Sequence, residues 1–207
     1  MLTVGQHPSP FDGACVMEIV SQTLGERWGD APCGVHPLLG HLARLVNDTL
    51  SDRRRDDLLE LVPVLATATD RSPASYPRLA LACTERALAT RSSMLLGHLH
   101  RVAAAELVRE TRLSSLPGDD APRFPGSPGK PAYPRRCNAG AVTVFPGAQA
   151  GPRLRRALYQ RGPAVRAVEA SVAALLPSPP PTRDDILFEM LQSAIDLVHG
   201  PRVEAPG

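Results

Sequence analysis

The sequence predicts an all-α protein, with a compact domain of about four to five helices followed by a Pro/Gly-rich linker and C-terminal helices. Aromatic residues make up only 4% of the 207-residue chain, so Leu, Val and Ala must build the core, which disfavours a β-sandwich. Apolar residues recur at helical spacing through most of the chain. The segment AVTVF at residues 141–145 is the one plausible strand, and it is short.

The first helix is expected after a flexible arm. Residues 1–11 contain Pro8 and Pro10, which oppose helix formation. Asp12 is a candidate N-cap, and apolar residues then follow at helical spacing up to Gly25, which ends the helix. Residues 25–37 are too rich in Gly and Pro for regular structure, so we expect a loop.

The next helices are delimited by proline and serine. Pro37 suits the first turn of a helix that ends near Leu50, because its missing N–H is not needed there. Ser51 can cap a third helix, which Pro63 should kink or end. Helical sequence continues over residues 78–112, and its length predicts a break near residues 90–93.

The C-terminal part is predicted as a helical segment behind a flexible linker, and its last helix either docks on the core or offers an amphipathic face elsewhere. The expected organisation is a flexible arm at 1–11, a helical core domain at 12–113, a linker at 114–149 and C-terminal helices at 150–201. Within this last part we expect helices at 151–161 and 163–175. Thr182 and Asp185 resemble a capping box for the final helix, which Gly200 ends.

Composition and missing motifs exclude several classes of function. The net charge is +2 and arginines alternate with acids, so no nucleic-acid surface is indicated. The chain has no apolar run that could span a membrane, and its first residues do not look like a signal peptide, so we expect a cytoplasmic protein. Glycine-rich nucleotide loops, nucleophile elbows and H-E-x-x-H are absent, which leaves enzyme activity uncertain.

Residues 12–48 concentrate the residue types that could carry chemistry. Cys15 and Glu18 share the i, i+3 spacing of Cys33 and His36, and together the four could form a tetrahedral zinc site. We favour a structural interpretation without a cofactor, in which the cysteines are buried, His36 caps the second helix and Glu18 pairs with an arginine. A Cys15–Cys33 disulfide is a further alternative.

Two other hypotheses concern the same residues. Cys15 in the first turn of a helix could be a nucleophile with a lowered pKa, with His36 or His41 as base and Asp30 or Glu26 as the orienting acid. Trp28, the only tryptophan, could form a half-exposed binding site together with Glu26 and Asp30. The alternative for Trp28 is packing over the corner between the first two helices.

This segment resembles a group of small uncharacterised actinobacterial and actinophage proteins. The shared pattern is D-G-x-C-x-M-E-x-x-S, then G-E, D-x-P-x-C-x-x-P-x-L and N-D. The matching residues are Asp12, Gly13, Cys15, Met17, Glu18, Ser21, Gly25, Glu26, Asp30, Pro32, Pro37, Leu39, Asn47 and Asp48. Cys33 corresponds to the second cysteine of the pattern, although it stands one residue earlier. Ala31 departs from the histidine often found in the group. The resemblance implies no particular activity.

Three functions follow from the sequence. The favoured hypothesis is a small helical module that binds a protein partner or regulates one, because catalytic signatures are absent. The first alternative is a metalloprotein or enzyme at the corner between the first two helices. The second alternative is a nucleic-acid accessory protein that uses arginine-rich helices such as residues 153–166.

Overall fold

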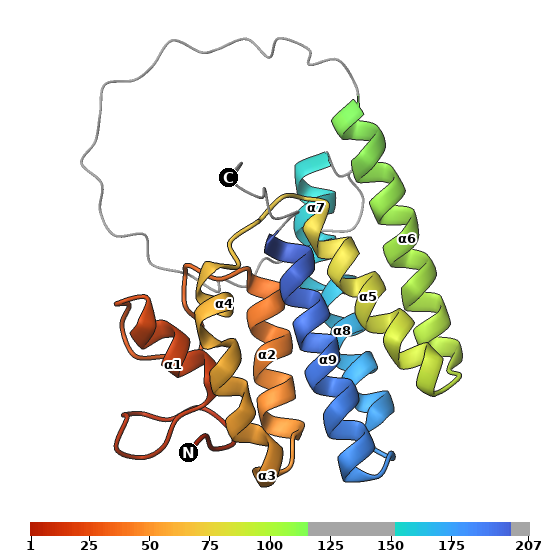
Figure 1. Ribbon diagram of the computed structural model, residues 1–207. Coiled ribbons are helices and arrows are strands. Elements are labelled where there is room, and N and C mark those ends of the chain that lie inside the picture. Colours follow the sequence, from red (N-terminus) through yellow and green to blue (C-terminus); the bar gives the residue numbers. More distant parts are fainter. Residues whose placement is uncertain (116–151, 200–207) are drawn as a thin grey trace, which may run out of the picture.

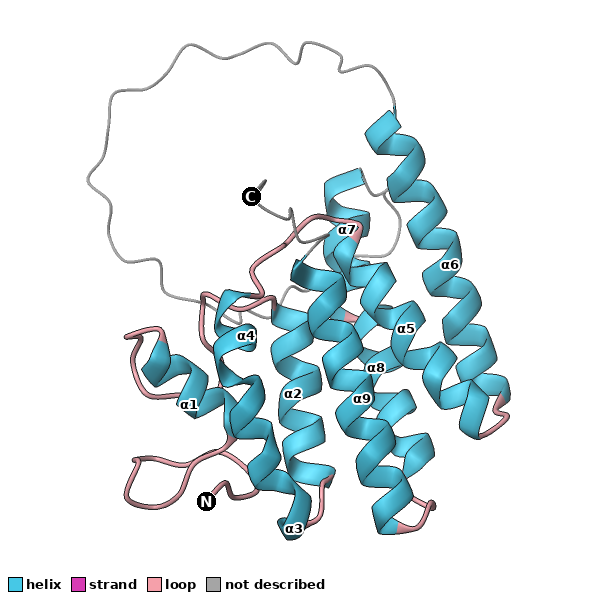
Figure 2. Ribbon diagram, in the orientation of Figure 1, coloured by secondary structure: helices cyan, strands magenta, loops and turns pink. Residues whose placement is uncertain are grey.

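The computed structural model describes residues 1–115 and 152–199, and every regular element in these two ranges is a helix (Figures 1 and 2). The all-α prediction is therefore confirmed. The predicted strand at 141–145 lies outside the described residues. The elements are α1 (Val16–Thr23), α2 (Pro37–Thr49), α3 (Asp52–Arg55), the 3₁₀ helix η1 (Asp56–Leu61), α4 (Val62–Thr67), α5 (Ser75–Thr90), α6 (Met94–Ser115), α7 (Pro152–Arg161), α8 (Pro163–Leu175) and α9 (Pro180–His199).

Helices α2, α5, α8 and α9 pack against one another and form the centre of the molecule. Helix α1 packs against α4 and α2 on one side of this group, and α6 packs against α5 and α8 on the other (Figure 1). Each central helix buries one apolar face. On α9 this face contains the predicted stripe, of which Leu187, Leu191 and Ala194 are fully buried.

The two parts of the chain share one hydrophobic core. Leu187 and Leu191 of α9 belong to the same buried cluster as Leu39 and Leu42 of α2. The C-terminal helices therefore pack on the helices of residues 12–113, and one hydrophobic core extends over both parts of the chain. The sequence indicated each apolar face but could not indicate which helices would cover it.

Several helix boundaries agree with the sequence predictions. Helix α1 ends before Gly25, whose φ of 67° is the left-handed conformation that glycine adopts readily. Pro37 is the first residue of α2, and the predicted break near residues 90–93 separates α5 from α6. Pro63 lies in the first turn of α4, where η1 gives way to a new helix.

Two predicted caps are wrong. The N-cap of α1 is Cys15, and the carboxylate of Asp12 instead accepts a hydrogen bond from the Ser9 hydroxyl. Helix α9 begins at Pro180, so Thr182 lies inside its first turn. Prolines fit the first turn of a helix and thus move its start upstream of the predicted capping box.

Asp184 of α9 takes over a capping role for another helix. Its carboxylate, only 3% exposed, accepts hydrogen bonds from the backbone N–H of Ser51 at 3.2 Å and from the Ser51 hydroxyl. Ser51 is the residue that precedes α3, as predicted, but its own side chain does not cap that helix. This contact ties the start of α3 to the start of α9.

Residues 1–11 differ from the flexible arm expected from the sequence. The Leu2 N–H donates to Asp56 at 2.5 Å, and the Gly5 N–H donates to Asp48 at 2.9 Å. The Thr3 N–H donates to the Ala14 carbonyl at 2.8 Å. Prolines prevent a helix here, but the backbone donors find acceptors on α2, on η1 and before α1.

Candidate functional site

Glu18 is the centre of the polar contacts at the start of α1. Its side chain is fully buried, and one carboxylate oxygen accepts a hydrogen bond from the His7 N–H at 2.6 Å. The other oxygen accepts from the Cys15 N–H at 2.7 Å and contacts His7 Nδ1 at 2.9 Å. Glu18 therefore pairs with His7 of the N-terminal segment. The sequence-based expectation of an arginine partner is wrong.

Hydrogen bonds keep this buried carboxylate ionised. Burial alone would raise the pKa of Glu18, but hydrogen bonds from Cys15 and His7 outweigh it and lower the pKa below its usual value. The carboxylate also reaches back to the N–H of the N-cap residue, which is half of a capping box. Glu18 thus fixes both the helix start and the chain that precedes it.

The four predicted metal ligands do not converge. Among the described residues no group of three or more His, Cys, Asp or Glu side chains is arranged to hold a metal ion. Cys15 and Glu18 are buried at the start of α1, whereas Cys33 is exposed in the loop before α2. Cys15 and Glu18 do contact each other, as their spacing predicts, but nothing in the sequence specifies where Cys33 and His36 lie relative to them.

His36 has both ring nitrogens engaged in structural contacts. Nδ1 accepts a hydrogen bond from the Leu39 N–H at 3.3 Å, so the predicted cap of the second helix is confirmed. Because Nδ1 is an acceptor, Nε2 carries the proton and donates to the Ser75 hydroxyl at 2.9 Å. Burial lowers the pKa of His36 to about 4, which keeps the ring neutral at pH 7.

Cys15 lacks the features of an activated nucleophile. Burial raises the pKa of its thiol to about 12, opposite to the lowering expected from the helix dipole. The candidate bases are engaged elsewhere, because His36 contacts Ser75 and His41 contacts Glu169 at 3.2 Å. Cys15 is also a free thiol, so the alternative of a Cys15–Cys33 disulfide is wrong.

The loop between α1 and α2 is held by contacts of Trp28, Glu26 and Asp30. Trp28 is half-buried against the core, and its indole N–H donates to the His7 carbonyl at 2.9 Å. The Glu26 carboxylate accepts from the N–H groups of Cys33 at 2.6 Å and Gly34 at 2.8 Å. Asp30 lies 3.6 Å from Arg44. The three side chains are separately engaged, so this structure favours the packing interpretation of Trp28.

The other residues that match the shared sequence pattern also make contacts that hold loops in place. Asn47 accepts from the Val16 N–H at 3.1 Å and donates to the Thr3 carbonyl at 2.9 Å. Ser21 donates to the Gly29 carbonyl at 2.5 Å. Gly13 has a φ of 126°, and a Cβ there would lie 2.5 Å from the Thr3 hydroxyl oxygen. The polar residues of the motif therefore mainly hold loops in place.

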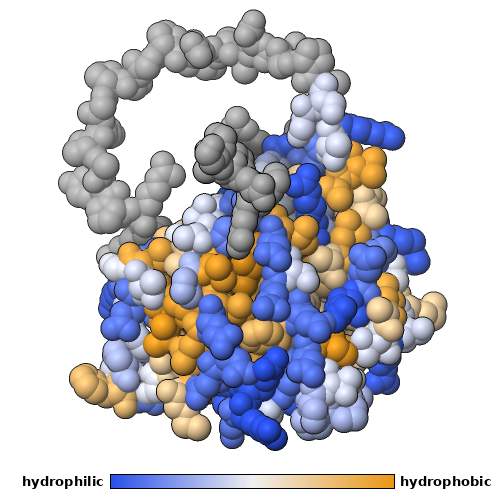
Figure 3. Space-filling model, viewed as in Figure 1, coloured by the Kyte–Doolittle hydropathy of each residue, from blue (hydrophilic) through white to orange (hydrophobic). Residues whose placement is uncertain are grey.

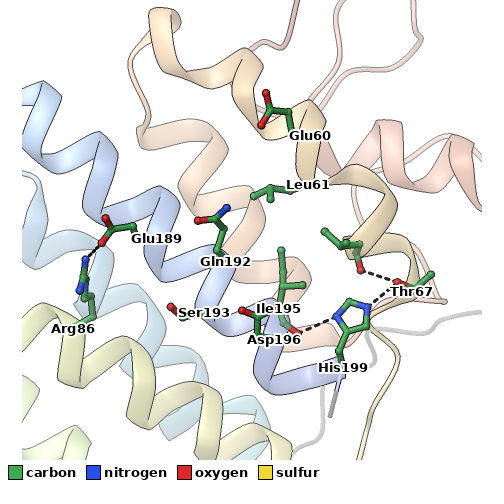
Figure 4. Close-up of a pocket in the computed structure, with 11 residues that line it drawn as sticks. Glu60, Leu61, Thr67, Arg86, Glu189, Gln192, Ser193, Ile195, Asp196 and His199 are labelled. Carbon is green, nitrogen blue, oxygen red and sulfur yellow. Dashed lines mark hydrogen bonds and ion pairs between the residues drawn. The ribbon is translucent and has the colours of Figure 1, made fainter. Parts of the chain in front are cut away.

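A groove that sequence reasoning missed lies between η1–α4, α5 and α9 (Figure 4). Its volume is about 1080 Å³. Helix α9 contributes residues at positions 189, 192, 193, 196 and 199, the face opposite its buried stripe. That polar face is visible in the sequence, but the elements that oppose it are not. Figure 3 shows hydrophobic surface among hydrophilic side chains on the side of the molecule that carries α4 and α9.

The groove has an apolar floor and an acidic rim. Leu61 and Ile195 are buried and Val64 is half-buried, whereas Glu60 and Asp196 are exposed. Arg86 and Glu189 form an ion pair across one end of the groove (Figure 4). Glu60 and Asp196 have no ion-pair partner among the described residues. The rim therefore keeps two unpaired negative charges.

A histidine closes the other end of the groove. His199 Nδ1 lies 3.2 Å from the Ile195 carbonyl, and Nε2 lies 2.7 Å from the Thr67 hydroxyl (Figure 4). A carbonyl oxygen can only accept, so Nδ1 carries the proton in the neutral ring and Nε2 accepts from Thr67. Thr67 also lies 3.1 Å from the Val64 carbonyl in its own helix. These contacts join the end of α9 to α4.

The arginine-rich helix proposed for nucleic-acid binding is partly neutralised. Arg156 of α7 binds the buried carboxylate of Glu110 with its Nε at 2.9 Å and its Nη2 at 2.6 Å. Arg109 contacts the same carboxylate at 2.9 Å. One arginine of the predicted 153–166 surface therefore joins α7 to α6 instead of facing a ligand.

Across residues 1–115 and 152–199, none of the helices combines the length and the apolar character needed to cross a membrane.

Comparison with known proteins identifies no relative. No model of a protein family matches the chain, no curated protein is significantly similar to it, and no solved structure matches its fold.

Proposed function

We propose that this protein is a binding module that holds a basic amphipathic helix of a partner protein in the groove between α4, α5 and α9. The observation that supports the proposal is the combination of an apolar floor at Leu61, Val64 and Ile195 with unpaired acids at Glu60 and Asp196. An amphipathic helix docks its apolar face into such a groove.

The dimensions of the groove favour a short helix over a small molecule. Its volume of 1080 Å³ is slightly above the range of ordinary ligand pockets, which is about 300–1,000 Å³. The lining residues of α9 extend from Glu189 to His199, a rise of about 15 Å at 1.5 Å per residue. About three turns of a partner helix can lie along this length.

Charge sets the specificity of the proposed interaction. Glu60 and Asp196 attract Lys or Arg side chains beside the apolar stripe of the partner, and they repel an acidic helix. Exposed rim charges act mainly on the rate of association and on discrimination between partners. Binding is therefore expected to weaken as the salt concentration rises.

A pair of designed peptides tests the proposal. One is a fluorescein-labelled helix of about four turns with Leu at positions i, i+3, i+4 and i+7 and Lys on the flanks; the other has Glu in place of each Lys. We expect fluorescence anisotropy to show saturable binding of the Lys peptide alone. The combined charge reversal Glu60→Lys and Asp196→Lys should weaken that binding by about tenfold or more.

Glu85 of α5 provides the matched control. It is exposed, does not line the groove and has no ion-pair partner among the described side chains, so Glu85→Lys should leave binding within about twofold of the wild type. No binding of the Lys peptide at 1 mM, equal binding of both peptides, or an equal effect of the groove and control variants would overturn the proposal.

A further inference from the structure

A second cavity lies at the start of α2 and shares no lining residue with the groove between α4, α5 and α9. It has a volume of about 220 Å³ and lies between the loop before α2, the first turns of α2 and the loop after α4. Its walls are mainly apolar and include Met17, Pro32, Val35 and Pro37, together with the ring of His36. This composition is typical of a small ligand site, in which an apolar body is buried and a few polar groups orient it.

The walls of this cavity are held in place before any ligand binds. His36 is fixed by Leu39 and Ser75, and its ring packs against Tyr76 with a centroid distance of 4.4 Å. Glu26 holds the loop through the N–H groups of Cys33 and Gly34. Fixed walls reduce the entropy that a ligand must lose on binding.

Two arginines give the cavity a positive character. Arg44 and Arg71 line it, and no carboxylate does so. Arg44 is partly neutralised by Asp30 at 3.6 Å. Arg71 has no carboxylate partner among the described residues. His36 is neutral because its pKa is lowered to about 4, so among the lining residues only the two guanidinium groups carry a charge.

Arg71 also has hydrogen-bond donors to spare. Its Nη2 donates to the Cys33 carbonyl and, at 2.9 Å, to the Val35 carbonyl, which positions the guanidinium over the cavity wall. Within residues 1–115 and 152–199, Nε and Nη1 have no hydrogen-bond acceptor. A planar guanidinium with free N–H groups is suited to a carboxylate.

We propose that this cavity binds a small monocarboxylate with an apolar body of about one aromatic ring. An apolar cavity of about 150 Å³ takes up one benzene molecule. The 220 Å³ found here therefore leaves room for a ring and a carboxylate. The ring lies against Met17, Val35 and the prolines, and the carboxylate accepts hydrogen bonds from Arg71, with Arg44 adding attraction.

Benzoate is the probe, and calorimetric titration into the full-length protein is the measurement. We expect saturable binding of benzoate. Benzamide, which has the same ring without the charge, and acetate, which has the charge without the ring, should each bind at least about tenfold more weakly. Equal binding of benzoate and benzamide would contradict the role of the arginines, and equal binding of benzoate and acetate would contradict the role of the cavity.

Two variants test the site from its two ends. Arg71→Gln should weaken benzoate binding by about tenfold or more, whereas Arg78→Gln should not change it, because Arg78 is exposed and does not line the cavity. Gly40→Leu should fill the cavity, since a Cβ at Gly40 lies 3.4 Å from the Met17 terminal methyl carbon and the longer side chain extends further.

The Gly40→Leu variant keeps the test decisive if Arg71→Gln does not fold correctly. If Arg71→Gln disturbs the loop, as circular dichroism and Tm would show, Gly40→Leu decides the matter, because leucine favours the helix over glycine. Benzoate binding that survives in a folded Gly40→Leu protein would overturn the proposal. So would the absence of any benzoate binding to the wild-type protein at 10 mM.

Discussion

Replacement of Glu18 by glutamine tests the buried polar cluster at the start of α1. The Glu18 carboxylate accepts three hydrogen bonds, from Cys15 N–H, His7 N–H and His7 Nδ1. In Glu18→Gln one acceptor oxygen remains, and the amide NH₂ faces at least one N–H donor. The helix start and the N-terminal segment both lose support.

The expected loss of stability follows from these contacts. A hydrogen bond to a charged group contributes about 1.5–3 kcal/mol, and a neutral one about 0.5–1.5 kcal/mol. Loss of one bond and weakening of two by about 1 kcal/mol each lowers the free energy of unfolding by about 3.5–5 kcal/mol. Glu85→Gln, on the exposed face of α5, should change it by less than about 0.5 kcal/mol.

Urea unfolding followed by tryptophan fluorescence measures this difference. Trp28 is the only tryptophan and donates to the His7 carbonyl, so it reports directly on the segment that Glu18 holds. The pKa of Glu18 is lowered from 4.5, so its ionised form stabilises the fold above that value, and this contribution is lost as the pH falls through the lowered pKa. The difference between wild type and Glu18→Gln should therefore be largest at pH 7 and shrink on acidification.

Two results would refute this reasoning. One is a loss from Glu18→Gln no larger than the loss from Glu85→Gln. The other is a difference that stays constant from pH 7 down to the acid limit of folding, because the ionised carboxylate would then contribute nothing specific.

Three further predictions concern the core and the connection between helices. Burial raises the pKa of Cys15 and Cys83 to about 12, so iodoacetamide at pH 8 should leave both thiols unmodified until urea is added; mass spectrometry that finds Cys15 alkylated in the folded protein would contradict this. Leu191→Ala should cost about 3–4 kcal/mol, because Leu191 is fully buried. Circular dichroism and tryptophan fluorescence should then shift to lower urea together, and separate transitions would show that the two parts of the chain do not share one core. Asp184→Ala should cost about 1–2 kcal/mol, as for a lost helix cap, because Ser51 loses its acceptor; Asp184→Asn keeps an acceptor and should cost less by the same urea measurement.

Local signals in the sequence were sufficient for the helices and for several of their ends. Gly25 and Pro37 act through their own backbone geometry, so their effect does not depend on the rest of the fold. The buried face of α9 also agrees with the prediction, because the periodicity of its apolar residues is a property of that segment alone. Caps were harder to predict, since Asp12 accepts from Ser9 within its own loop, and Ser51 donates to Asp184, which lies far away in the sequence.

The candidate site depended on long-range placement that spacing does not encode. The pairing of Glu18 with His7 joins a helix to a segment expected to be flexible, and no pattern in either element specifies the contact. Cys33 and His36 retained their local spacing, yet the loop left one exposed and buried the other. The acidic groove required knowledge that Glu60 and Asp196, far apart in sequence, border the same surface.

The shared core has a consequence for how the protein could be divided. Helices α8 and α9 have their main partners in α2, α5 and α6, on the far side of residues 116–151 in the chain. A polypeptide ending after α6 would leave the apolar faces of α2 and α5 uncovered, and one beginning at α7 would lack a surface on which to fold. Produced together as separate pieces, the two should recombine without a covalent connection, which makes this protein a natural starting point for a split reporter.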